Sequence, residues 1–198
     1  MKSKGFLALL IAATLFAQNA SALPVGDKWL YDSLPDVAFS IGSGSALVDC
    51  EVYKYTSGDY VNEYVYTYQI SNVDSGVGLS LFSVGILPGA DAYDPNFELL
   101  PGVVAPASWS VVTSGVVESV NGLFTSVIES GGLWSASVPL WFVSDSEPIL
   151  GNGALFGTSS GIPYYATGDL LTPVPEPATL TLFGIGVLIT LTRRRRPA

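Results

Sequence analysis

Catalytic and metal-binding side chains are scarce in this sequence of 198 residues, which contains no histidine and one cysteine. Histidine is the usual general base of hydrolases and the commonest metal ligand, so sites of both kinds lack their usual residue. A single cysteine forms neither a disulfide within the chain nor a zinc site of several cysteines. A glycosidase that uses two carboxylates needs neither residue, and this enzymatic alternative stays open. We expect a protein that is not an enzyme and has no cofactor.

Positive charge is scarce outside the two ends of the chain. Between residues 27 and 176, Lys28 and Lys54 are the basic side chains, whereas all 17 acidic residues lie in this range. Binding of nucleic acid requires clustered lysine and arginine, so we expect no nucleic-acid partner. The acidic composition favours solubility, cation binding or contact with neutral sugars.

Residues 1–22 have the pattern of a secretory signal peptide. A basic start precedes an apolar run, and Ala20-Ser21-Ala22 fits a cleavage site with small residues at Ala20 and Ala22. We therefore expect export, with Leu23 as the mature N-terminus.

The last part of the chain has three consecutive segments with different properties. Val174, Pro175, Glu176 and Pro177 are followed by an apolar run over residues 178–192 and by Arg193, Arg194, Arg195 and Arg196. Each proline disfavours helix in the residue before it, so the first segment should be extended. The apolar run predicts a transmembrane helix about 22 Å long, which is short for a bilayer core of about 30 Å. The arginines favour the cytoplasmic side, because positive residues resist translocation.

Two plainer interpretations of this tail are a core helix that ends in solvated charges and an ordinary anchor after a proline-rich linker. The first requires protein on every side of the helix, because the run has no polar face. The second leaves Pro175-Glu176-Pro177 without a specific role.

The order of the three segments resembles the PEP-CTERM sorting signal of Gram-negative bacteria, here over residues 173–198. In that family an exosortase, a membrane-embedded thiol protease or transpeptidase, recognises the motif and removes the helix. The resemblance implies an exosortase as partner, a precursor held transiently in the inner membrane, and later release to the cell surface or extracellular matrix. It also implies association with exopolysaccharide or biofilm. Pro175-Glu176-Pro177 is then a substrate site, and no residue of this chain need be catalytic.

The region between these segments, residues 23–172, has the composition of one all-β domain. It is rich in Val, Ser, Gly, Thr and Tyr, and it breaks into short runs bounded by Gly, Pro, Asn and Asp. Period-two alternation predicts strands over 46–55 and 60–72, joined as a hairpin by Ser57-Gly58-Asp59. About eight or nine short strands predict an antiparallel β-sandwich or jelly roll as the ectodomain.

Two connections in this domain carry specific expectations. Residues 88–108 contain four prolines and should form a loop that crosses between the sheets. Asn121-Gly122 predicts a two-residue hairpin with Val120 facing Leu123, because this dipeptide accepts the positive φ values of a type I′ turn. Further strands are predicted over residues 77–87, 133–143, 153–157 and 163–167.

Three groups of residues are candidates for binding or reactivity. Cys50 shares a strand face with Val48 and Val52, which predicts a buried, unreactive thiol, with intermolecular pairing as the alternative. One group of oxygen ligands is suited to Ca²⁺ but matches no EF-hand, so a solvated loop is the alternative; it comprises Asp91, Asp94, Asn96 and Glu98. The aromatic side chains predict either core or a stacking platform for sugars, and the tryptophans among them are Trp29, Trp109, Trp134 and Trp141.

These patterns predict an exported, non-enzymatic protein, and the resemblance to the PEP-CTERM family implies a surface or extracellular-matrix protein that is sorted and cleaved at its C-terminal signal. The alternative is a permanently tail-anchored periplasmic carbohydrate-binding module. The two differ in whether the mature protein keeps the residues that follow Pro175-Glu176-Pro177.

Overall fold

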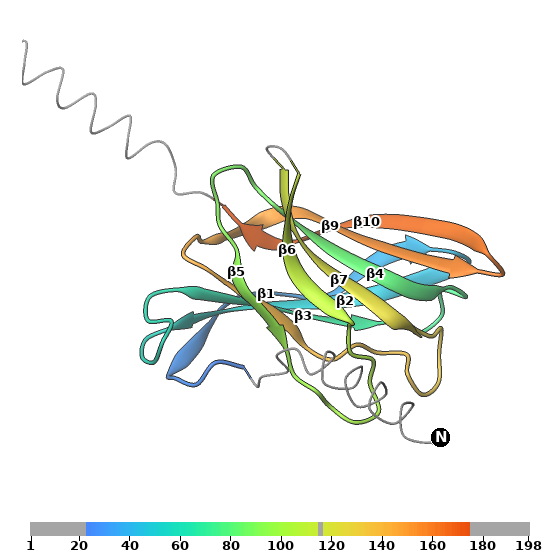
Figure 1. The fold of residues 1–198 in the computed structure, drawn as a ribbon, viewed down its shortest axis with the longest axis horizontal. Helices are drawn as coiled ribbons and strands as arrows, with labels where there is room; N and C mark the ends of the chain where they lie inside the picture. The colour runs from blue at the N-terminus through green and yellow to red at the C-terminus, as the bar shows by residue number, and fades with distance from the viewer. Residues whose placement is uncertain (1–22, 115–116, 175–198) are drawn as a thin grey trace, which may run out of the picture.

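Two five-stranded β-sheets face each other as a sandwich (Figure 1). The computed structural model describes residues 23–114 and 117–174. Within these residues every pair of neighbouring strands is antiparallel, and there is no helix. The predicted all-β class with two antiparallel sheets is therefore confirmed.

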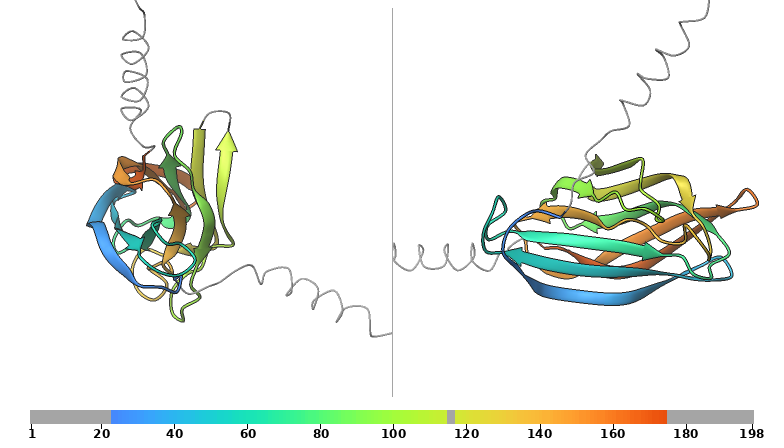
Figure 2. Two further views of the ribbon diagram at one scale, coloured as in Figure 1. Left: turned by 90° about the vertical axis from the view of Figure 1, so that its left-hand side faces the viewer. Right: turned by 90° about the horizontal axis from the view of Figure 1, so that it is seen from below.

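The strand order shows how the chain is distributed between the sheets. The first sheet has the order β1 (Lys28–Ile41), β2 (Gly44–Tyr55), β3 (Tyr64–Ser71), β8 (Leu140–Ser144), β5 (Tyr93–Phe97). The second has the order β10 (Ile162–Pro173), β9 (Pro148–Ser159), β4 (Gly78–Ile86), β7 (Val117–Ile128), β6 (Ser108–Ser114). The end-on view shows that the two sheets approach each other along β1 and β10 (Figure 2).

The predicted hairpin of residues 46–55 and 60–72 is confirmed as β2 and β3, with Cys50 opposite Tyr68. β3 begins at Tyr64, four residues later than predicted. The alternation in β2 also holds, because Ala46, Val48, Cys50 and Val52 are all fully buried between the sheets.

The outer strands β1 and β10 differ more from the sequence prediction. No strand was predicted over β1, whose register against β2 shifts between Leu30 and Asp32 and again between Leu34 and Val37. Such irregularities break the period-two pattern by which a strand is recognised. β9 and β10 are much longer than predicted, and their turn is Ser160-Gly161, with φ values of 50° and 80°. This pair of positive φ values is what a type I′ hairpin turn requires.

The predicted hairpin at Asn121-Gly122 is wrong, because both residues lie inside the continuous strand β7, between β4 and β6. Gly122 is opposite Trp109 in β6, and a Cβ atom there would lie 3.1 Å from Cε3 of that tryptophan. The glycine therefore makes room for an indole ring and does not turn the chain. The observed connection into β7 lies between Ser114 and Val117, which pair with each other.

The chain first crosses between the sheets over residues 72–77, earlier than predicted, because β3 and β4 belong to different sheets. The buried side chain of Asn72 holds this crossing, since its Nδ2 donates to the carbonyl oxygens of Val77 at 2.7 Å and Ile128 at 2.8 Å. The segment 88–108 also crosses, as predicted, but it contains β5 and so passes to the first sheet and back.

Aromatic rings fill the middle of the space between the sheets. Phe82 and Trp109 stack with ring centroids 6.0 Å apart, and Tyr68 lies 5.7 Å from Phe82 and 5.9 Å from Phe142. A smaller group on the opposite face of the first sheet, which we call the outer cluster, consists of Tyr55, Val65, Trp141 and Val143. The two predicted faces of residues 138–143 are thus confirmed, with Phe142 in the core and Trp141 outside it.

Candidate functional site

The last described residue is Val174, which follows β10 directly and is the first residue of the predicted motif at 174–177. Pro173 pairs with Pro148 in β9, and the Val174 N–H donates to the carbonyl oxygen of Glu147 at 2.9 Å. The folded domain therefore holds the backbone up to the residue before Pro175. Outside the described residues lie Ala20 and Ala22, Pro175, Glu176 and Pro177, the predicted transmembrane helix 178–192, and Arg193, Arg194, Arg195 and Arg196.

The end of β10 is also held from the opposite sheet. The Tyr68 hydroxyl donates to the Leu171 carbonyl oxygen at 2.6 Å, and the Cys50 thiol donates to the same oxygen over 3.8 Å. Burial raises the pKa of Cys50 to about 12 and the pKa of Tyr68 well above its ordinary value, so both groups stay protonated at neutral pH. Cys50 is thus the buried, unreactive thiol that the sequence predicted.

The turn before β9 accepts hydrogen bonds from two more tyrosines of β3. The Tyr66 hydroxyl donates to the carbonyl oxygen of Ser146 at 2.7 Å, and the Tyr64 hydroxyl donates to Oε1 of Glu147 at 3.0 Å. Burial and the bond to Glu147 both raise the pKa of Tyr64. We call these groups the tail base, which comprises Tyr64, Tyr66, Tyr68, Ser146, Glu147 and residues 171–174.

Both lysines of the domain lie against aromatic rings, and Lys54 also contacts the tail base through Tyr64. Nζ of Lys54 donates to the Tyr64 hydroxyl at 2.7 Å and is 4.4 Å from the centroid of that ring. Nζ of Lys28 is 4.7 Å from the ring centroid of Tyr53, and burial lowers the pKa of Lys28. Tyr31 packs edge-on against Tyr64 at 5.0 Å. Both positive charges of the domain therefore make cation–π contacts, and that of Lys54 lies at the tail base.

The residues predicted as Ca²⁺ ligands have separate partners. Glu98 contacts the Pro139 carbonyl oxygen through its backbone N–H, not through its side chain. The other three side chains accept different hydrogen bonds: Asp91 from Ser144 Oγ at 2.8 Å, Asp94 from the Tyr60 hydroxyl at 3.1 Å, and Asn96 from the Phe97 N–H at 2.8 Å. Across residues 23–114 and 117–174, no three acidic, cysteine or histidine side chains are placed to hold one metal ion.

The four tryptophans do not form one sugar-binding surface. Trp109 and Trp141 are buried, whereas Trp29 and Trp134 are each about half exposed, on β1 and in the turn that follows β7. The tyrosines of β3 that share a face point into the core between the sheets. These tyrosines therefore belong to the core, which is the first of the two interpretations given for the aromatic side chains.

One sequence signal for an enzyme was missed and is explained by the structure. Residues 157–161 have the spacing Gly-x-Ser-x-Gly of hydrolase nucleophile motifs. In those hydrolases the serine lies on a turn between a strand and a helix. Here the motif spans the end of β9 and the tight turn into β10, so Ser159 lies in a β-hairpin opposite Ile162.

Tyr64 and Glu147 were not predicted to act together. They are 83 positions apart in the chain, and the antiparallel pairing of β3 with β8 places Tyr64 opposite Ser144, next to the turn that carries Glu147. The sequence offers only an indirect signal, namely a tyrosine stripe with hydroxyl groups that need partners when buried.

Comparison with known proteins identifies the C-terminal segment. The family model described as the PEP-CTERM protein-sorting motif matches residues 173–196, which confirms the resemblance noted in the sequence. No curated protein and no solved structure matches the chain. The match begins at Pro173, so the sorting motif starts on the last residue of β10. Residues 23–114 and 117–174 include no helix long and apolar enough to cross a membrane.

Proposed function

We propose that this is an exported, non-enzymatic surface or extracellular-matrix protein whose C-terminal signal is recognised and cut by an exosortase. The observation that carries the proposal is the PEP-CTERM motif at residues 173–196, attached without a spacer to the last strand of a folded β-sandwich. The acidic composition of the domain and its lack of histidine support a role other than catalysis. Exopolysaccharide or biofilm is the proposed setting of the mature protein.

The proposed route begins with a signal peptide at residues 1–22 and passes through a precursor anchored in the inner membrane by residues 178–192. Cleavage near Pro175-Glu176-Pro177 then releases the domain. The tail base supports this role, because it fixes the backbone beside the motif through the bonds to Glu147 and Leu171. A processing enzyme would therefore find the backbone beside the motif in the same conformation in every molecule of the protein.

The test is the mass of the mature protein from cells with and without an exosortase. We expect loss of the residues after the Pro-Glu-Pro segment only in cells that have the enzyme. Replacing Pro175 and Pro177 together by alanine should abolish the shortened form. Pro163→Ala, a proline at the far end of β10, is the matched control and should be processed normally.

An intact C-terminus with all four arginines, in cells that possess the enzyme, would contradict the proposal. That result would favour the permanently anchored periplasmic carbohydrate-binding module instead. Equal processing of the double proline variant would place the recognised feature elsewhere in residues 173–196.

A further inference from the structure

A pocket of about 670 Å³ lies next to the outer cluster. Its walls come from residues 23–25, from the loop after β2, from β5 and from two tryptophans. The polar and aromatic residues among them are Asp59, Tyr60, Asp94, Asn96, Trp109 and Trp141. Sites for small ligands commonly have volumes of about 300–1,000 Å³ and combine apolar walls with a few polar groups.

Trp141 supplies a buried polar group of this pocket that lacks a hydrogen-bond partner. Its side chain is 3% exposed, and its indole N–H finds no acceptor within the described chain. The neighbouring Trp109 contrasts with it, because its indole N–H donates to the Trp141 carbonyl oxygen at 2.8 Å. A buried donor without an acceptor is unfavourable, so this position calls for an oxygen atom from a bound molecule.

The charges around the pocket restrict what that molecule can be. Asp59 and Asp94 disfavour an anion, since a second negative charge nearby would be repelled. The indole N–H does not serve a metal ion, because it donates and has no lone pair to offer. What fits both groups is a neutral molecule whose oxygens accept from the indole and whose hydroxyl groups donate to the carboxylates.

We propose that this pocket binds one neutral glycosyl unit of a polysaccharide. Trp141 donates its indole N–H to a sugar oxygen, and Asp94 accepts from a sugar hydroxyl with the carboxylate oxygen that does not bind Tyr60. Asp59, at the rim, accepts a second hydroxyl. This inference names a site for the saccharide partner in the proposed function and rests on that function for its biological setting. Its test measures binding alone, so a failure of sorting leaves it standing.

The experiment uses the full chain from a host without the processing enzyme, held in a zwitterionic detergent that has no sugar headgroup. The four tryptophans give four indole N–H signals in a ¹⁵N spectrum, and the Trp141 signal is the one lost in Trp141→Phe. Titration with neutral tetrasaccharides of glucose, galactose and mannose should shift the Trp141 signal in a saturable way with at least one sugar.

Trp141→Phe and Asp94→Asn should each weaken the binding about tenfold. The first removes the indole donor, and the second leaves one neutral acceptor oxygen for the hydroxyls of Tyr60 and the sugar in place of two charged ones. Asp94→Asn keeps the shape of the side chain, so it tests the site even if the first variant folds poorly. Trp134→Phe is the matched control, because this tryptophan is half exposed and lies outside the pocket, and its affinity should equal that of the unmodified chain.

Two results would overturn the proposal. One is a Trp141 signal that moves with none of the three sugars, which would leave a buried water as the partner of the indole. The other is sugar binding that is unchanged in Trp141→Phe and Asp94→Asn and is lost in Trp134→Phe. That result would place the sugar site at the exposed ring of Trp134.

Discussion

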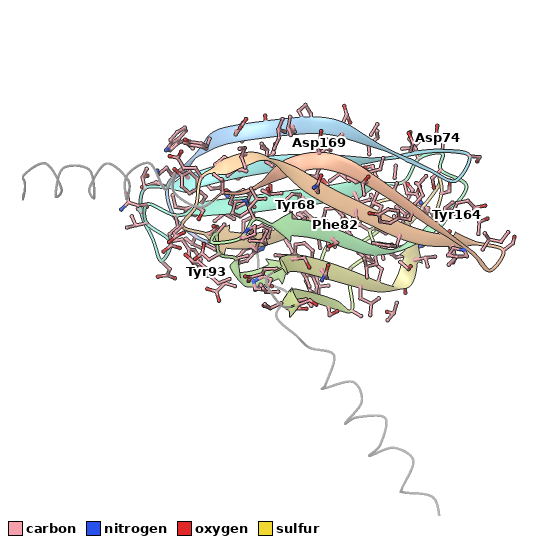
Figure 3. The ribbon with its side chains drawn as sticks, turned by 90° about the horizontal axis from the view of Figure 1, so that it is seen from above. Tyr68, Asp74, Phe82, Tyr93, Tyr164 and Asp169 are labelled. Carbon is pink, nitrogen blue, oxygen red and sulfur yellow. The ribbon has the colours of Figure 1, made fainter. Side chains whose placement is uncertain are left out.

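The two halves of β10 have opposite environments although they belong to one strand. The half that leaves the turn at Ser160-Gly161 is largely exposed, and its Tyr165 is 59% exposed beside Phe156. The half that leads to the tail is buried from Leu170 to Pro173 and accepts hydrogen bonds from the other sheet. Figure 3 shows Tyr164, which belongs to the exposed half, toward one end of the molecule. The contrast teaches that the strand is fixed most firmly where the sorting motif begins.

Small residues make the tight packing of the buried half possible. A Cβ atom on Gly153 would lie 2.3 Å from Cδ1 of Leu170, and one on Gly168 would lie 2.9 Å from Cζ of Phe39. Leu170 and Phe39 thus occupy space that these two glycines leave open. At Gly161, in the turn that leads into the exposed half, a Cβ atom would meet nothing within 4 Å.

The largest effect is expected from removing the buried leucine. Leu170→Ala should lower the free energy of unfolding by about 2–5 kcal/mol, because it leaves a cavity in a fully buried position. Tyr165→Ala in the exposed half should cost less than about 1 kcal/mol. Unfolding in guanidinium, followed by tryptophan fluorescence, measures both values. Equal losses in the two variants would remove the distinction between the halves.

A smaller effect is expected from one hydroxyl group. Tyr68→Phe should lower the free energy of unfolding by about 1–3 kcal/mol, because the Leu171 carbonyl oxygen loses its main buried donor. Tyr165→Phe removes an exposed hydroxyl and should change it by less than about 0.5 kcal/mol. Hydrogen exchange at the Val174 amide should also become faster in Tyr68→Phe only. If that exchange rate does not change, the tail base is held by its backbone bonds alone.

The smallest effect concerns pH at the tail-base end. Burial raises the pKa of Asp91, and the neighbouring Asp145 carboxylate adds to this. A raised pKa in the folded state means that the contribution of Asp91 to stability is full below its unfolded pKa and is lost as pH rises through the folded value. Asp91→Asn should therefore stabilise the protein at pH 7 by less than about 1 kcal/mol, since the group is partly exposed to screening solvent. The gain should disappear below about pH 4, and a gain that persists there would contradict the assignment.

Local patterns predicted the parts of the fold that depend on alternation. The buried faces of β2 and β3 followed from every second residue being apolar, and so did the two faces around Phe142. β1 was missed because its two register shifts and Pro35 interrupt that alternation. The hairpin predicted at Asn121-Gly122 was wrong because strand pairing with β4 and β6, and the packing of the Trp109 ring, override the turn preference of this dipeptide.

The sorting motif could be predicted from the sequence because it is one continuous segment, and the family match confirms it. The tail base could not, since its members come from β3, from the turn before β9 and from the end of β10. The same holds for the pocket at Trp141, where β5 and β8 must pair before Asp94 and Asn96 lie near the indole.

The hydrogen bond from Val174 to Glu147 limits how much free chain a cut tail would leave. If the tail is cut within Pro175-Glu176-Pro177, the new C-terminus projects only a few residues beyond a strand that is paired and buried. A carboxypeptidase needs a stretch of free extended chain, and here it would meet the folded domain almost at once. Sorting at this position would thus leave an end that is resistant to trimming.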